Sequence, residues 1–225
     1  MQLIETFFNW EILVRSFPML LRGVGNTLLL GCASIVIGGA VGLLVCLMRL
    51  YGSKPVRLLA IAYIDVLRAM PILVLLILIY YALPFVGIRF SSFTSATLAL
   101  SLVLSAFTAE VCRAGIESIP KGQFEAASAL GLGFWRAMHK VILPQALRVV
   151  VPPLTSNCAS IFKDTALASV VAMPDLLKQA TDAQALMANP TPLIGAALIY
   201  LAFLLPLVRL VSYLEERGKR QLTAR

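Results

Sequence analysis

The sequence predicts an all-α, polytopic membrane protein, and three observations support this prediction. Hydrophobic residues make up 60% of the chain. Charged residues make up only 13%, whereas they approach a quarter of an average soluble domain. The apolar residues also form blocks without Asp, Glu, Lys or Arg, at 23–48, 69–88, 90–109 and 183–208. Each block reaches the roughly 20 residues that a helix needs to cross a bilayer.

We expect five transmembrane helices, near residues 20–48, 58–84, 93–115, 149–173 and 193–213, in a single membrane domain that covers residues 1–225. The first span contains small residues at three- and four-residue spacing, which favour close contact with another helix along one side: Gly31, Gly38, Gly39 and Gly42, with Ala33, Ser34 and Ala40. Residues 1–18 mix aromatic and polar side chains and suit a short segment at the membrane surface rather than a span.

The basic residues predict the orientation. If the N-terminus is outside and the C-terminus is cytoplasmic, thirteen Lys and Arg fall in inner loops and the tail, and four fall in outer segments. This distribution satisfies the positive-inside rule, and the opposite orientation violates it. It also accounts for the net charge of +8 without nucleic acid, because the cations cluster between spans rather than along one face.

The sequence offers no set of residues for chemistry. The four cysteines lie in apolar surroundings without metal-ligand or disulfide spacing. No glycine-rich phosphate loop, nucleophile with a base, or metal-binding cluster can be assembled. We therefore expect neither an enzyme nor a metal site, and no cofactor bound by this chain.

Two spans carry charged residues three positions apart near their inner ends, Asp65 with Arg68 and Glu110 with Arg113. Such pairs share a helix face, so each charge can offset the cost of the other in lipid. They could be structural ion pairs or parts of a polar seam through the bundle, and the sequence leaves both open. Pro71, just after Arg68, is expected to bend the second span.

The fourth span contains Asn157, Lys163, Asp164 and Thr165. An ionised residue at mid-membrane costs on the order of 2.5–3.5 kcal/mol, so these side chains should face the bundle interior. Adjacent residues point about 100° apart on a helix, which favours an unwound turn or a water-filled cavity over a paired brace. An internal ion-pair brace remains the alternative.

The loop 120–144 is the most polar and finely spaced segment, and it falls on the cytoplasmic side. Glycines at 131 and 133 should divide it into two short helices, the second ending at Pro144. An amphipathic connector on the membrane surface is one interpretation. The small pair Ala126-Ala127 favours another, in which the first helix enters a groove of a partner protein.

The spacing of this loop resembles the EAA loop of ABC-importer permeases. The matching residues are Glu125-Ala126-Ala127, Gly131, Val141 and Leu143-Pro144, with Val141 where that motif usually has Ile. Further segments are similar to the polar amino acid branch of these permeases: Arg68-Ala69-Met70-Pro71, Ala109 to Gly115, Gly122-Gln123, Leu143 to Ala146 and Lys163 to Leu167. Ala69-Met70 and Ala166 depart from that branch, which often has Gly-Thr and Ser there.

The resemblance implies a permease subunit that moves an amino acid by alternating access. Its partners would be a second permease subunit, identical or related, two ATPase subunits that bind ATP and Mg²⁺, an extracytoplasmic amino-acid-binding protein and membrane lipid. The residues expected to couple to the ATPase are Glu125, Ala126, Ala127, Gly131, Leu143 and Pro144. Those expected to bind substrate are Arg68, Asn157, Lys163, Asp164, Thr165 and Glu110.

An acidic amino acid is the expected substrate, because Arg68 and Lys163 could bind two carboxylates and the second span is similar to glutamate/aspartate permeases. Two rival functions stay open. One is an ion-coupled secondary carrier or channel, although such carriers usually show doubled halves. The other is a membrane anchor that only recruits a partner through the loop 120–144.

Overall fold

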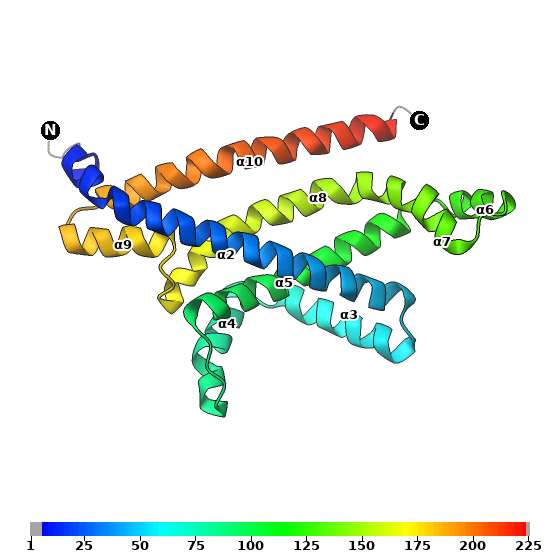
Figure 1. Cartoon of the computed structure of the whole chain (residues 1–225), viewed down its shortest axis with the longest axis horizontal. Coiled ribbons are helices and arrows are strands. Elements are labelled where there is room, and N and C mark those ends of the chain that lie inside the picture. Colours follow the sequence, from blue (N-terminus) through cyan, green and yellow to red (C-terminus); the bar gives the residue numbers. More distant parts are fainter. Residues whose placement is uncertain (1–5, 224–225) are drawn as a thin grey trace.

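The chain folds into an elongated bundle of helices, seen in a computed structural model that describes residues 6–223 (Figure 1). No strand occurs between these residues, which confirms the all-α prediction. Most of the predicted basic tail, including Arg217, Lys219, Arg220 and Arg225, has side chains outside the described part of the chain, as do the first five residues.

The first helix, α2 (Trp10–Tyr51), is 42 residues long. At a rise of 1.5 Å per residue it extends about 60 Å, roughly twice the hydrocarbon thickness of a bilayer. Its N-cap is Asn9, whose Oδ1 accepts a hydrogen bond from the amide of Ile12 at 3.2 Å. The expectation that residues 1–18 form a separate interfacial segment is therefore wrong for 10–18, because this cap starts a helix that continues through Pro18.

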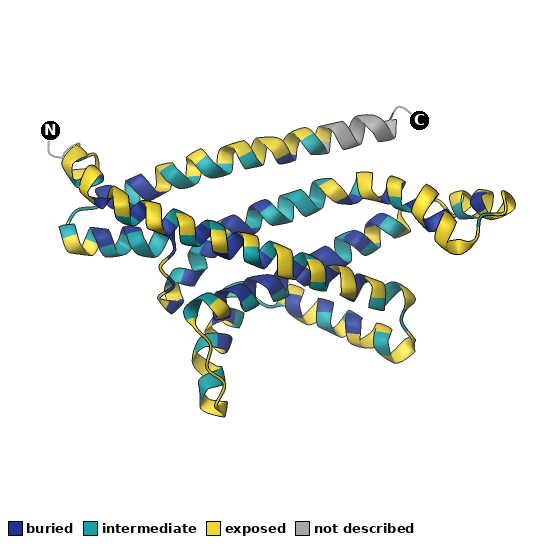
Figure 2. Cartoon of the chain, in the orientation of Figure 1, coloured by how far each residue is buried: buried dark blue, intermediate teal, exposed yellow. Residues whose placement is uncertain are grey.

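Helix α2 packs closely on α5 (Ser92–Glu117), the most buried long helix of the bundle (Figure 2). A methyl group added to Gly38 would lie 2.9 Å from the carbonyl oxygen of Ser101, and one added to Gly42 would lie 2.7 Å from that of Ser105. The predicted role of small residues in this span is confirmed, since only glycine permits this approach.

The second predicted span is broken. Helix α3 (Lys54–Ala69) ends before Pro71, and α4 (Ile72–Ile77) continues through a π-helical turn, η1 (Leu78–Ala82), and a 3-10 turn, η2 (Leu83–Val86). The helix direction changes by 102° between the two halves. Pro71 therefore bends the chain where expected, but far more sharply than a kinked span, and α4 leaves the bundle at a steep angle (Figure 1).

The fourth predicted span consists of α8 (Leu143–Asp164) and the 3-10 helix η4 (Thr165–Val171). The helix does not end at Pro144 as predicted. Instead α7 (Phe134–Ala137) and a π-helical turn, η3 (Met138–Ile142), run directly into α8, and Pro144 lies in its first turn, where a missing amide is tolerated.

Two further helices complete the bundle, α9 (Leu176–Met187) and α10 (Thr191–Thr223). Among the described residues, α2, α5 and the part of α10 up to Leu214 are each long and apolar enough to cross a membrane. The bent pair α3–α4 would be a fourth crossing. The first, third and fifth predicted spans are thus single helices, the second is broken, and α8 carries too many polar residues to qualify by composition.

Candidate functional site

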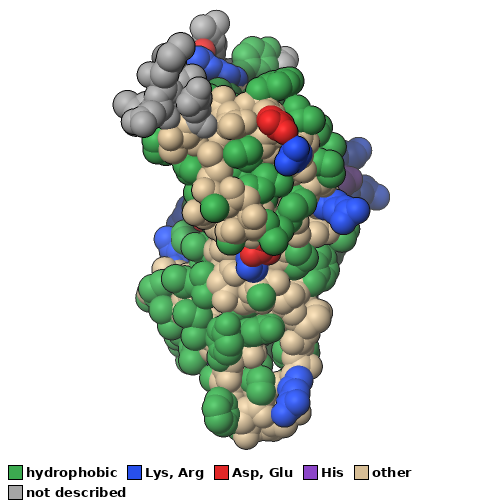
Figure 3. All heavy atoms as spheres, turned by 90° about the vertical axis from the view of Figure 1, so that its left-hand side faces the viewer, with side chains coloured by type: hydrophobic (Ala, Val, Ile, Leu, Met, Phe, Trp, Pro, Cys, Tyr) green, Lys and Arg blue, Asp and Glu red, His purple; other side chains and the backbone are tan. Residues whose placement is uncertain are grey.

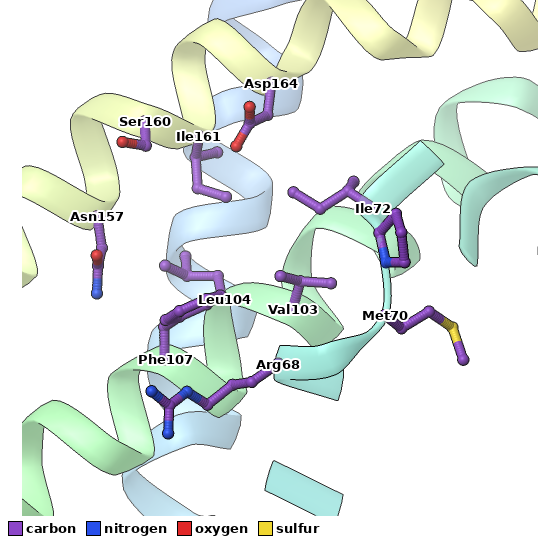
Figure 4. Close-up of a pocket in the computed structure, with 11 residues that line it drawn as sticks. Arg68, Met70, Ile72, Val103, Leu104, Phe107, Asn157, Ser160, Ile161 and Asp164 are labelled. Carbon is purple, nitrogen blue, oxygen red and sulfur yellow. The ribbon is translucent and has the colours of Figure 1, made fainter. Parts of the chain in front are cut away.

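A cavity of about 360 Å³ opens where the break between α3 and α4 faces the middle of α5 and the end of α8 (Figure 4). Its size falls within the range of small-molecule pockets. One wall is apolar and includes Val103, Leu104 and Phe107 of α5 and Ile161 of α8. The cavity lies at the sharp bend of the second span, because Met70, Pro71 and Ile72 line it.

Four polar side chains line the same cavity: Arg68 from α3 and Asn157, Ser160 and Asp164 from α8. Asn157, Ser160 and Asp164 recur at helical spacing and so share one face of α8. In the close-up, Asp164 and Arg68 approach from opposite sides (Figure 4). The pocket therefore has one cationic and one anionic end, with apolar side chains around them.

Two polar side chains of the pocket, those of Asn157 and Arg68, have hydrogen-bond donors that a ligand could use. The Nδ2 of Asn157 is buried and has no hydrogen-bond partner among the described residues. Unpartnered buried donors are rare in folded proteins, because each costs about 1–3 kcal/mol. The guanidinium carbon of Arg68 lies 5.6 Å from the ring centre of Phe107, a cation–π contact that positions Arg68 without using its hydrogen-bond donors.

Three of the residues expected to bind substrate do not line this cavity. Lys163 is exposed on another face of α8. Thr165 is fully buried, and its hydroxyl donates to the carbonyl oxygen of Phe162 at 2.8 Å. Glu110 forms ion pairs with Arg113 and with Arg49, the latter at 2.6 Å.

Of the two charge pairs predicted from the sequence, one forms an ion pair in the structure and the other does not. Glu110 and Arg113 form a structural ion pair, which Arg49 extends across to α2. Asp65 forms no ion pair within residues 6–223, so Arg68 is left for the cavity. The contribution of Phe107 and its apolar neighbours could not be foreseen, because their only sequence signal is ordinary span hydrophobicity.

The predicted coupling segment protrudes from one end of the bundle (Figure 1). Its first helix, α6 (Lys121–Ala129), begins directly after Pro120, which occupies the N-cap position without a side-chain hydrogen bond. Gly131 ends it with a φ of +73°, so the predicted interruption at this glycine is confirmed. Glu125 and Ala126 are exposed, whereas Ala127 is buried.

The second half of this segment anchors α6 to the bundle. Leu143 packs against a buried cluster of Ile119, Met138 and Ile142. Pro144 is exposed beside it. Leu130 and Trp135 are large, apolar and strongly exposed near the tip, as in a surface that another protein covers.

The opposite end of the molecule presents mainly apolar and uncharged groups, with isolated charged side chains (Figure 3). Asp175 caps α9 there, and its Oδ1 accepts from the amide of Lys178 at 2.9 Å. Its carboxyl group is completely buried, and Oδ2 has no hydrogen-bond partner in the described chain. Burial therefore raises the pKa of Asp175 to about 6.

Comparison with known proteins agrees with this architecture. Residues 34–220 match the family "Binding-protein-dependent transport system inner membrane component". The chain is 37% identical to the probable glutamine ABC transporter permease protein GlnM of Bacillus subtilis (strain 168), over 93% of this chain and 97% of that protein. It is 35% identical to the glutamate/aspartate import permease protein GltK of Escherichia coli O6:H1, over 93% and 98% of the two chains.

The solved crystal structure of an amino acid ABC transporter with histidines superposes on this chain with a TM-score of 0.85. It is 37% identical and covers 91% of this chain and 96% of its own. The family match spans most of the chain, and its residues 34–220 include both the second predicted span and the loop 120–144. The chain therefore belongs to the binding-protein-dependent transport system inner membrane components, as a non-enzymatic permease subunit of an amino-acid ABC transporter.

Proposed function

We propose that this subunit imports an amino acid that binds as a zwitterion between Arg68 and Asp164. The observation that supports this proposal is the pocket itself, which combines one cation, one carboxylate and the unpartnered amide of Asn157. An α-carboxylate is recognised by a guanidinium, which can donate two parallel hydrogen bonds. An α-ammonium group needs a carboxylate, which Asp164 provides.

The same charges argue for a substrate whose side chain is neutral. Among the residues that line the cavity, Arg68 is the only cation and Asp164 the only anion, so their charges cancel. A zwitterion with a neutral side chain keeps this balance. A second carboxylate would enter the pocket without a partner, at a cost of several kilocalories per mole.

An acidic amino acid is the second candidate, and the similarity to the glutamate/aspartate permease GltK supports it. In that case Lys163, which is exposed and adjacent to Asp164, would have to supply the second cation. The neutral and the acidic substrate predict different effects of one substitution at Lys163. Lys163→Gln should leave uptake of a neutral amino acid unchanged but weaken uptake of an acidic one.

The proposed assembly contains a second permease subunit, two ATPase subunits with ATP and Mg²⁺, and an extracytoplasmic binding protein that delivers the amino acid. The N-terminus is outside and the segment from α6 to η3 is cytoplasmic. Closure of the ATPases would move α6, and α7 would transmit that movement, because it is continuous with α8 and hence with Asp164. Access to the pocket would then alternate between the two sides of the membrane.

The test is uptake by the complete transporter in liposomes, with ATP inside, the binding protein outside and a panel of radiolabelled amino acids that includes glutamine, glutamate and arginine. Competition among them identifies the substrate class. Selective uptake of glutamate that depends on Lys163 would refute the neutral substrate. Uptake by this chain alone, driven by an ion gradient without ATPase subunits, would instead support a secondary carrier and overturn the proposed function.

A further inference from the structure

A second cavity lies apart from the amino-acid pocket, where the ends of three helices meet. It has a volume of about 220 Å³ and is lined by Arg49, Leu50, Arg57, Ile61, Arg113 and Glu117. Arg49 and Leu50 belong to the last turns of α2, Arg57 and Ile61 to the start of α3, and Arg113 and Glu117 to the end of α5. The turn between α2 and α3 lies at the same end of the bundle as α6 (Figure 1).

The charges in this cavity do not cancel. Arg49 and Arg113 both pair with Glu110, and Arg113 also pairs with Glu117. Three arginines thus face two glutamates, which leaves one positive charge in excess. That charge is on Arg57, which forms no ion pair within residues 6–223.

The cationic site is built into the fold rather than scattered over the surface. The side chains of Arg49 and Arg113 are only 19% and 21% exposed, and their ion pairs fix their positions. The N-terminus of α3 adds to the positive potential. Ser53 makes no side-chain cap, and the first turn contains no acidic residue. Pro55 has no amide hydrogen and the amide of Arg57 donates to the carbonyl oxygen of Ser53, so the amides of Lys54 and Val56 are the ones available to an anion.

The surroundings of the cavity are those of a lipid-facing surface. Leu47, one helical turn before Leu50, is 52% exposed, and Leu58, next to Arg57, is 66% exposed. An anion bound here would have Leu50 and Ile61 of the cavity wall beside it, and the exposed Leu47 and Leu58 belong to the same two helices. A soluble anion makes no use of such neighbours, whereas a phospholipid has acyl chains that cover them.

We propose that this cavity binds the headgroup of an anionic phospholipid. The phosphate accepts hydrogen bonds from Arg57 and from the edge of Arg49, and the acyl chains lie along Leu47 and Leu58. Basic pockets between helices at the cytoplasmic surface suit such headgroups. The inference depends on the proposed orientation only for placing the lipid in the cytoplasmic leaflet.

The site predicts that lipid bound here holds the cytoplasmic ends of α2, α3 and α5 together. Three arginines, Arg49, Arg57 and Arg113, come from these three ends and line one cavity, so an anion between them offsets the repulsion of their charges. Removal of the anionic lipid should therefore loosen this end of the bundle and leave the amino-acid pocket intact.

The experiment measures lipid retained by the purified transporter complex. The complex is delipidated, incubated with phosphatidylglycerol or phosphatidylcholine, and analysed by native mass spectrometry. The test variant is Arg57→Gln, which breaks no ion pair. The matched control is Arg148→Gln, which removes the same charge from an exposed position on α8 outside the cavity.

We expect one tightly retained phosphatidylglycerol per copy of this chain, with about tenfold weaker retention in Arg57→Gln, as for loss of a hydrogen bond to a charged group. Arg148→Gln should retain lipid like the unmodified chain. Equal retention in all three proteins, or equal loss in both variants, would overturn the proposal.

Two further measurements distinguish a bound lipid from a soluble anion and from a protein contact. If inorganic phosphate displaces phosphatidylglycerol as readily as the whole lipid does, the site binds a soluble anion and the lipid proposal fails. If Arg57→Gln instead releases the ATPase subunits and keeps the lipid, the cavity is a protein contact. None of these readouts requires transport, so the proposed function can fail independently of this site.

Discussion

Arg68 and Asp164 are the two residues on which amino-acid binding depends most. Replacing Arg68 by Gln or Asp164 by Asn removes a charged hydrogen-bond partner and leaves the shape of the pocket almost unchanged. Hydrogen bonds to charged groups contribute about 1.5–3 kcal/mol, so we expect uptake at low substrate concentration to fall at least tenfold in either variant.

The measurement is ATP-dependent uptake in liposomes, with subunit composition checked by gel filtration. The Arg148→Gln variant is the control for a charge removed from α8 outside the pocket. Normal uptake by both Arg68→Gln and Asp164→Asn would show that this cavity is not on the substrate path.

Asp175 predicts a pH dependence of stability. Its pKa is raised to about 6 from an ordinary 3.8, because its carboxyl group is buried. A raised pKa means that the folded state prefers the protonated form, so its contribution to stability is fully present below about pH 4 and is lost as the pH rises through 6. This difference in pKa between the unfolded and the folded state corresponds to about 3 kcal/mol at most.

We therefore expect Asp175→Asn to raise the apparent melting temperature of the purified transporter at pH 8 and to leave it unchanged at pH 4. Asparagine keeps an oxygen that can accept from the amide of Lys178, so the cap of α9 is retained. A difference between variant and unmodified protein that is independent of pH would contradict a titration of Asp175.

At the scale of the elements, the contact between α2 and α5 should depend on single glycines. In Gly42→Ala the new methyl group would lie 2.6 Å from Cβ of Thr108 and 2.7 Å from the carbonyl oxygen of Ser105, so the helices must separate. We expect a loss of about 1–3 kcal/mol in stability, measured as a lower melting temperature. Gly39→Ala is the control, because no atom lies within 4 Å of its added methyl group.

The coupling segment offers a second pair of matched glycines. Gly131 has a φ of +73°, which costs an alanine roughly 1–2 kcal/mol, whereas Gly133 has a φ of −63° that any residue adopts. We expect Gly131→Ala to lower the ratio of amino acid transported to ATP hydrolysed, because it displaces α6 relative to α7. Gly133→Ala should keep the normal ratio, and equal ratios in both would argue against a coupling role for this turn.

The elements also mark the limit of sequence interpretation. Hydrophobic blocks located α2, α5 and α10, since these helices need only length and apolar composition. They could not show that the second block turns by 102°, because Pro71 is compatible with a slight kink or a complete break. In the structure both halves, α3 and α4, contact α5, a long-range contact that the sequence does not reveal.

The candidate site was predictable in part for the same reason. Polar and charged residues are costly inside a membrane, so Arg68, Asn157 and Asp164 were predicted to line a site, and they do line one cavity. The same cost also selected Lys163, which lies on another face of α8, and Glu110, which is satisfied by two arginines. Sequence distance does not reveal that Arg49 is close to Glu110, because 61 residues separate them.

For the whole molecule, the distribution of basic residues predicts that α9 is outside and the segment from α6 to η3 inside. Single cysteines at Leu186 and Trp135, both strongly exposed, test this orientation. We expect a membrane-impermeant maleimide to label Leu186→Cys in intact spheroplasts and Trp135→Cys only after permeabilisation. A chain with its four native cysteines alone provides the background, and the reverse pattern would refute the orientation.

The break at Pro71 has a consequence for how the chain exists in lipid. It lies beside the middle of α5, and Arg68, Ala69 and Pro71 around it are exposed. Hydrocarbon cannot solvate the peptide groups of an interrupted helix, so such backbone occurs at this depth only beneath another protein or beside water. A single copy in a bilayer would therefore expose peptide groups of this break to hydrocarbon, where they have no hydrogen-bond partner. In the proposed assembly, a second permease subunit would cover this break and complete the surface that faces the lipid.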